Sequence, residues 1–155
     1  MSNSSQEMID GINQILRFLG SYGGIITIDD DWQFSLYVHD YGSEEDLESG
    51  EYEIEMASSA EINGDCLNDP LFRIVVKFDE AHEMVVSAKL IVYWSEWPGG
   101  WMKIDKDDDI YDSMGNKEHV DGELEERFCS YLKTITKFRP YLTNPTSVER
   151  FDDYF

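Results

Sequence analysis

The sequence predicts an α+β fold in which an antiparallel β-sheet of five to six strands has an N-terminal and a C-terminal helix packed on one face. Three observations predict it: an apolar helical stripe near each end of the chain, alternating or apolar segments between them, and short turn-rich connections. The 155 residues suit one acidic domain over 1–155, because a chain of this length can bury a substantial apolar core.

The first helix is predicted from its start signal and its apolar face. Ser4 and Glu7 fit a capping box, in which each side chain bonds the other residue's backbone N–H. Apolar residues then recur at helical spacing, at Met8, Ile9, Ile12, Ile15, Leu16 and Leu19. The glycines that follow, Gly20, Gly23 and Gly24, predict its end.

The middle of the chain reads as strands. They are expected at residues 24–28, 32–41, 51–57, 71–78, 84–94 and 101–104. Apolar residues alternate with polar ones over 32–41, which predicts one buried and one exposed face. The most apolar segments, 71–78 and 84–94, are expected at the centre of the sheet, and residues 61–70 are dense in turn formers and are expected to form a loop.

A second helix is predicted roughly from Gly122 to Phe138. Its apolar stripe comprises Leu124, Phe128, Tyr131, Leu132 and Ile135. Pro140 stops it, because proline cannot continue the hydrogen-bonded ladder. A short tail helix over 146–155 is also expected, since Thr146 and Glu149 fit another capping box.

Charge is the most unusual property of the composition. With 33 Asp and Glu against 12 Lys and Arg, the formal net charge is −21. Nucleic acids and anionic membranes are bound through Lys and Arg, so neither is expected as a direct partner. A basic protein surface is the expected partner, because opposite charge steers encounter.

The sequence offers no cofactor motif. No phosphate-binding glycine loop, zinc-binding HExxH or paired-cysteine motif occurs, so a non-enzymatic protein without a cofactor is expected. The two cysteines, Cys66 and Cys129, do not make a disulfide framework, and the first residues lack a basic start and an apolar run. A cytoplasmic location is therefore expected.

An acidic partner-binding face is predicted between Arg17 and Arg73, an interval without Lys or Arg. Glu51, Glu53 and Glu55 alternate along one strand, which places their carboxylates about 6.8 Å apart in a row. Such a row can imitate the phosphates of a nucleic acid to a protein that grips them. With this acidic row, the predicted face includes Asp29, Asp30 and Asp31; the alternative is a solvated face that prevents edge-to-edge pairing.

A glycine-rich turn flanked by aromatics is a second candidate surface. Trp97 and Trp101 enclose Pro98, Gly99 and Gly100, and exposed tryptophans are frequent interface anchors. Self-association through this turn is one interpretation, which leaves the oligomeric state open, and a hydrophobic cap over one end of the sheet is another.

Two further motifs are candidate sites. Asp105, Asp107 and Asp109 have the spacing that opens a calcium loop, but Ile110 and Asn116 stand where glycine and glutamate are required. No metal site is predicted there, although weak cation binding stays open. His39 lies with Tyr37 and Ser35 on the polar side of its strand and is the candidate centre of an alternative enzymatic site; the other interpretation is a surface histidine.

The segment YEIEMASSAEINGDCLNDPLFRI carries a resemblance. It combines a strand, the Asn63-Gly64-Asp65 turn, Asp69-Pro70 and a further strand. With the two flanking helices it resembles, over residues 12–138, a family of uncharacterised small bacterial proteins associated with mobile elements. Ser58 and Ser59 stand where that family tends to have His-Tyr. The resemblance implies no activity or cofactor; its setting suggests an inhibitor of a nucleic-acid-handling enzyme or a toxin-neutralising immunity protein.

Overall fold

A computed structural model describes residues 3–28, 32–39, 47, 50–62, 65–95, 100–104, 110–111, 117–118 and 123–154. Within them lie the following elements: α1 (Asn3–Leu19), β1 (Gly23–Thr27), β2 (Trp32–His39), β3 (Glu51–Ile62), β4 (Asp65–Phe78), β5 (Val85–Ser95), β6 (Gly100–Ile104), β7 (Ile110–Tyr111), β8 (Lys117–Glu118), α2 (Glu123–Lys133), a π-helical turn (Thr134–Phe138), β9 (Ser147–Arg150) and a 3₁₀ turn (Phe151–Tyr154).

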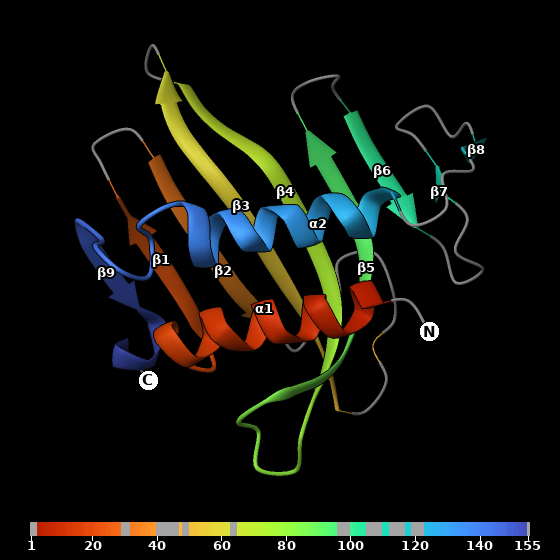
Figure 1. Ribbon diagram of the computed structural model, residues 1–155, viewed down its shortest axis with the longest axis horizontal. Coiled ribbons are helices and arrows are strands. Elements are labelled where there is room, and N and C mark those ends of the chain that lie inside the picture. The colour runs from red at the N-terminus through yellow and green to blue at the C-terminus, as the bar shows by residue number, and fades with distance from the viewer. Residues whose placement is uncertain are drawn as a thin grey trace.

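The strands form one antiparallel sheet in the order β8-β7-β6-β5-β4-β3-β2-β1-β9. The six predicted strands correspond to β1–β6, and the two predicted helices to α1 and α2, so the predicted α+β class is confirmed. Figure 1 shows α1 and α2 side by side across one face of the sheet, running in the same direction. We call this side the helix face and the opposite side the far face.

The main core lies between the helices and the helix face. Phe34, Leu36, Ile54, Met56, Phe72, Ile74 and Val76 point from the strands to the helices, and each is essentially inaccessible to solvent. The predicted stripes of both helices are buried against them, including Ile12, Ile15, Phe128 and Leu132. The alternation in the sequence therefore identified this face correctly.

Two residues fix how α1 sits. At Gly11 a Cβ atom would lie 2.9 Å from Leu132 Cδ1, so glycine allows α1 and α2 to pack closely. Asn13 is buried and bonds the backbone of Val85 twice: its Nδ2 donates to the carbonyl oxygen at 2.9 Å, and its Oδ1 accepts from the N–H at 2.7 Å. This side chain pins α1 to the start of β5.

The prediction of a loop over residues 61–70 is wrong. β3 continues to Ile62 and β4 begins at Asp65, with Ile62 and Asp65 paired, so only residues 63 and 64 separate two long strands. Ladder pairing extends almost to the tip because each added pair satisfies backbone donors and acceptors. Turn-forming residue types therefore do not exclude a strand when a neighbouring strand can pair with it.

The tail helix predicted over 146–155 is also wrong. Residues 147–150 form β9, which pairs with Gly24–Thr27 of β1, and a short 3₁₀ turn follows. The edge of β1 offers a row of backbone partners that an isolated short helix lacks. Arg150 strengthens the attachment, because its Nε donates to the carbonyl oxygen of Phe18 at 3.0 Å near the end of α1.

The second helix ends close to the predicted position. α2 passes into the π-helical turn, which ends at Phe138. Arg139 is extended, as expected for the residue before a proline.

Candidate functional site

The far face holds the predicted acidic row, and the neighbouring strands place cations beside it. Glu51 pairs with Lys77 of β4, and Glu55 pairs with Arg73. Arg73 Nε lies 3.9 Å from Glu55 Oε2. The row is free of basic residues in the sequence but has cations directly across from it in the sheet.

Glu53 does not lie on the surface. Only 2% of it is exposed, so it cannot contribute to an exposed acidic row as the sequence predicted. It stands between His39 of β2 and Val75 of β4 in the ladder. A carboxylate is buried this far only when other groups satisfy it, so Glu53 belongs to the internal structure of the far face.

An apolar cluster beside Glu53 explains part of this burial. Val75, Ile91 and Val92 are buried on the far face, and Leu47 packs against them. The pairing shifts by one residue between Arg73 and Ile74, so Ile91 is an extra residue in β5. The bulge allows Ile91 and Val92 to join one cluster, which strict alternation would have placed on opposite faces.

Asp29, Asp30 and Asp31 lie outside the described residues. The strand that follows them begins at Trp32, which pairs with Ala60, five residues along β3 from Glu55. That separation is about 17 Å along the strand. The start of β2 therefore lies beside the end of β3 that is opposite to Glu51.

The aromatic turn is described only in part. Trp97 lies outside the described residues, and Trp101 is placed as a backbone position of β6 that pairs with Trp94. Its role as a partner-binding residue stays a prediction.

His39 lies in an aromatic group on the far face. Its ring stacks on Tyr37 at 6.2 Å between centroids, and Tyr37 also contacts Phe151 of the tail at 5.0 Å. His39 stands directly across from Glu53, an arrangement in which a carboxylate can orient an imidazole. The candidate enzymatic site of the sequence therefore gains a carboxylate neighbour that the sequence pattern did not identify.

The β4–β5 hairpin projects beyond the rest of the sheet (Figure 1). Its loop is braced by Asp79, whose Oδ1 accepts from the N–H groups of Glu83 at 2.8 Å and Met84 at 3.3 Å. His82 has a φ of 56°, unusual for a residue with a side chain, and its ring stacks on Phe78 at 4.0 Å. The hydrogen bonds of Asp79 and the ring contact of His82 therefore brace the loop.

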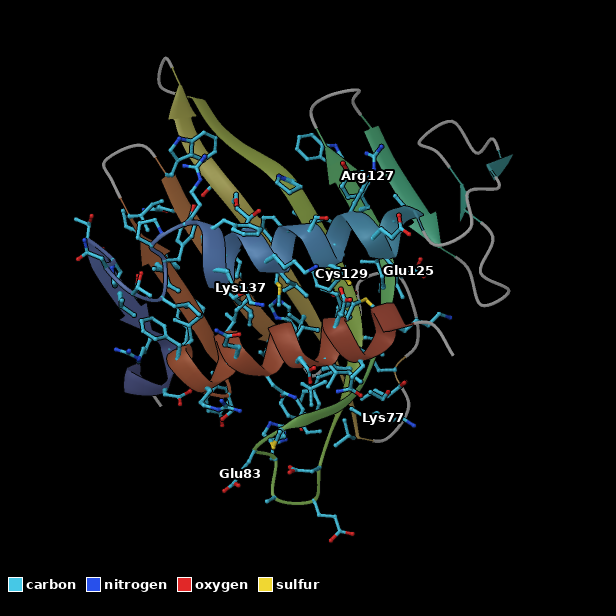
Figure 2. All side chains as sticks on the ribbon, viewed as in Figure 1. Lys77, Glu83, Glu125, Arg127, Cys129 and Lys137 are labelled. Carbon is cyan, nitrogen blue, oxygen red and sulfur yellow. The ribbon has the colours of Figure 1, made fainter. Side chains whose placement is uncertain are left out.

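Charged and apolar side chains are exposed on this hairpin. Glu80 and Glu83 are exposed, as are Met84 at 47% and Val86 at 56%. Val86 is exposed because the pairing shifts between Lys77 and Phe78, which inserts an extra residue into β5. Figure 2 shows Glu83 at the loop and Lys77 on the neighbouring strand.

A groove of about 520 Å³ lies between α2 and the strands β4 and β5. Its lining comprises Pro70, Phe72, Tyr93, Glu126, Arg127, Ser130 and Tyr131, and we call it the α2 groove. The rings of Phe72 and Tyr93 are 5.1 Å apart, and those of Phe72 and Tyr131 are 5.2 Å apart, so three aromatic side chains form its floor. It lies on the helix face, so it is separated by the sheet from His39.

Arg127 stands at the rim of this groove. Its Nη1 donates to the hydroxyl of Tyr93 at 3.3 Å, and its guanidinium lies 5.8 Å from the centre of the Tyr93 ring. Figure 2 shows Arg127 on the side of α2 away from α1. Tyr131 is fixed from below, because its hydroxyl shares a 2.8 Å hydrogen bond with Ser58 Oγ. Burial also raises the pKa of Tyr131 and keeps it neutral.

Cys129 lies on the opposite side of α2, toward α1 (Figure 2). Burial, and after it the nearby Glu7 carboxylate, raises the pKa of this thiol to about 11. The thiol is therefore protonated at neutral pH and unsuited to act as a nucleophile. Cys129 instead packs as a small buried residue of the main core.

The aspartates at 105, 107 and 109 lie outside the described residues. Elsewhere, in the part of the chain that the structure describes, no group of three or more His, Cys, Asp or Glu is placed to hold a metal ion. Nor does any helix there have both the length and the apolar character needed to cross a membrane.

Comparisons of this chain with protein-family models, with curated proteins and with solved structures found no match. The resemblance carried by residues 52–74 therefore stays a prediction, and function has to be argued from the side chains.

Proposed function

We propose that this protein is a non-enzymatic binding module that presents carboxylates and apolar side chains of its β4–β5 hairpin to a basic protein partner. One observation carries the proposal: a projecting, braced loop exposes Glu80, Glu83, Met84 and Val86 together. Exposed apolar groups surrounded by charge are typical of protein interfaces.

The charge of the hairpin favours a basic partner. Residues 77–86 contain three carboxylates, at Asp79, Glu80 and Glu83, and one cation, Lys77. The whole protein is also strongly negative, with a net charge of −21, so its field attracts a cationic surface over distances of about the 8 Å Debye length in physiological salt. The acidic row on β3 is a weaker candidate, because Glu53 is buried and cations flank the others.

The rigidity of the loop favours binding. The two hydrogen bonds to Asp79 and the stacking of His82 on Phe78 fix the loop before any partner arrives. A preorganised loop loses little conformational entropy on association, which improves affinity without further contacts. An inhibitor that imitates nucleic-acid charge and an immunity protein that neutralises a toxin would both use such a surface, and the class of the partner distinguishes them.

Affinity capture from source-cell extract, with elution by a salt gradient, tests the proposal. We expect a protein rich in Lys and Arg to be retained and then eluted by moderate salt. Retention should be lost with Glu80→Lys/Glu83→Lys and reduced with Met84→Ser/Val86→Ser, because these remove the charge and the apolar contact respectively.

A matched control separates a site from general charge. Asp10→Lys/Glu126→Lys changes the net charge by the same amount on exposed helix positions and should leave retention unchanged. Equal losses with both charge-reversed proteins would show unspecific attraction. Undiminished retention with both would remove the hairpin as the binding surface.

A further inference from the structure

We propose that the α2 groove binds a small aromatic monocarboxylate, with its ring on the aromatic floor and its carboxylate on Arg127. The proposal is independent of the β4–β5 hairpin, because the groove uses other residues on the helix face. A volume of about 520 Å³ falls within the range of roughly 300–1,000 Å³ that small-molecule sites occupy.

The floor suits a flat apolar group. Phe72, Tyr93 and Tyr131 are buried, and their mutual ring contacts hold them in fixed orientations. Phe128 packs on Phe72 from the side of α2 at 4.8 Å, which further limits movement of the floor. The parts of Tyr93 and Tyr131 that stay exposed can meet a ligand ring edge-to-face, the geometry that aromatic pairs prefer together with offset stacking.

The rim defines the charge of the ligand. Arg127 is held toward the groove by its hydrogen bond to the Tyr93 hydroxyl and by its position over the same ring. A guanidinium presents parallel N–H donors that match a carboxylate. Ser130, one turn along α2 from Arg127 and Glu126, adds a hydroxyl that can donate to the same ligand.

Glu126 restricts the ligand to a single negative charge. Its carboxylate lies on the same rim, so a second negative charge on the ligand would be repelled. The rest of the acidic protein contributes less, because charges beyond about 8 Å are largely screened in physiological salt. One cation beside one carboxylate therefore favours a monoanion over a dianion such as a phosphate monoester.

Isothermal titration of the full-length protein with indole-3-propanoate tests the inference, with indole-3-propanamide as the neutral analogue of equal size. We expect the acid to bind at least about tenfold more tightly than the amide, since a charged hydrogen bond is lost in the amide. Equal binding of the two compounds, or no binding of the acid at millimolar concentration, would overturn the proposal.

Variants of the rim give effects of opposite sign. Arg127→Gln should weaken binding of the acid at least about tenfold while leaving the amide unchanged. Glu126→Gln should tighten binding of the acid several-fold, because it removes the repelling charge. Tyr93→Phe should give an intermediate loss, because it keeps the ring but removes the oxygen that orients Arg127.

Lys137→Gln is the control, since this cation of the helix layer does not line the groove. If it weakened binding of the acid as much as Arg127→Gln does, the binding would reflect the net charge of the protein, and the groove would not be the site. If Glu126→Gln weakened binding of the acid, the assignment of the ligand as an anion held by Arg127 alone would be wrong. Urea denaturation of each variant checks that the fold is retained.

Discussion

The helix face and the far face of the sheet are built from alternate residues of the same strands, yet the side chains that pack on the two faces differ in kind. On the helix face, aromatic and aliphatic side chains form one continuous core beneath α1 and α2. On the far face, a small cluster around Val75 lies beside carboxylates and cations that pair between strands. One face is stabilised mainly by apolar burial, and the other combines a little burial with pairing of charges.

This difference has a functional consequence. Arg73 lies 3.9 Å from Glu55, and Lys77 stands across from Glu51 in the strand register, so two cations lie beside the charges that the sequence offered to a partner. Among the described residues, no third strand lies beside the hairpin loop to provide such cations, and the loop's carboxylates at Glu80 and Glu83 are exposed. The net charge of a segment is therefore a poor guide to a binding surface by itself, because residues of the neighbouring strands can place opposite charges beside it.

The largest effect is expected on the helix face. Phe128→Ala should lower the free energy of unfolding by about 3–5 kcal/mol, because it leaves a cavity at a fully buried position. Val75→Ala on the far face should cost about 1–2 kcal/mol, since it removes fewer atoms from a smaller cluster. Urea denaturation measures both, and equal losses would show that the two faces contribute alike.

A smaller effect is expected at the polar contact of the helix face. Asn13→Ala removes both hydrogen bonds to Val85 and leaves a buried N–H and carbonyl without that partner. The expected loss is about 2–3 kcal/mol in the free energy of unfolding. Gln14→Ala, at the exposed neighbouring position, should change it by less than about 0.5 kcal/mol.

Two glutamates of β3 allow a buried and a more accessible carboxylate of the far face to be compared. Glu53→Ala should lower the free energy of unfolding by about 1–3 kcal/mol, because its buried contacts are lost and their partners stay buried. Glu51→Ala should cost less than about 1 kcal/mol, as a more accessible charge. A negligible effect of Glu53→Ala would indicate that the far face opens to water at this position.

The ion pair of the far face is expected to contribute little. A double-mutant cycle on Glu55→Gln and Arg73→Gln should give a coupling energy below about 1 kcal/mol, because both side chains are partly exposed and 3.9 Å apart. The coupling should fall further in 1 M salt. A value that is large and insensitive to salt would show a pair shielded from solvent.

A pH effect is expected from the helix layer. The pKa of Cys129 is about 11 in the folded chain and 9.0 as its ordinary value, so between these pH values the unfolded chain releases a proton that the folded chain keeps. Stability should therefore be unaffected by this thiol below about pH 9 and should fall as the pH rises toward 11. In a Cys66→Ser background, Cys129→Ala should remove that part of the decline in urea denaturation.

Some features of this protein follow from local sequence. Helix stripes such as Ile12 and Ile15, and the alternation at Phe34 and Leu36, identify residues buried on the helix face because side-chain direction repeats regularly along each element. The class of the fold follows from the order of these elements. The carboxylates of the hairpin were visible in the sequence, but nothing local indicated that Met84 and Val86 would be exposed beside them.

The sequence by itself determined the α+β class, the residues of the main core and the strong negative charge. Only the tertiary structure decided which charges stay available. Strand register sets Lys77 across from Glu51 and Arg73 across from Glu55, Glu53 between them is buried, and register joins residues far apart in the chain. The tertiary structure also decided the fate of the tail, which forms β9 because the edge of β1 offers backbone partners. The α2 groove arises in the same way, since Arg127 and Tyr93 come from different elements and line one groove only when α2 packs on the sheet.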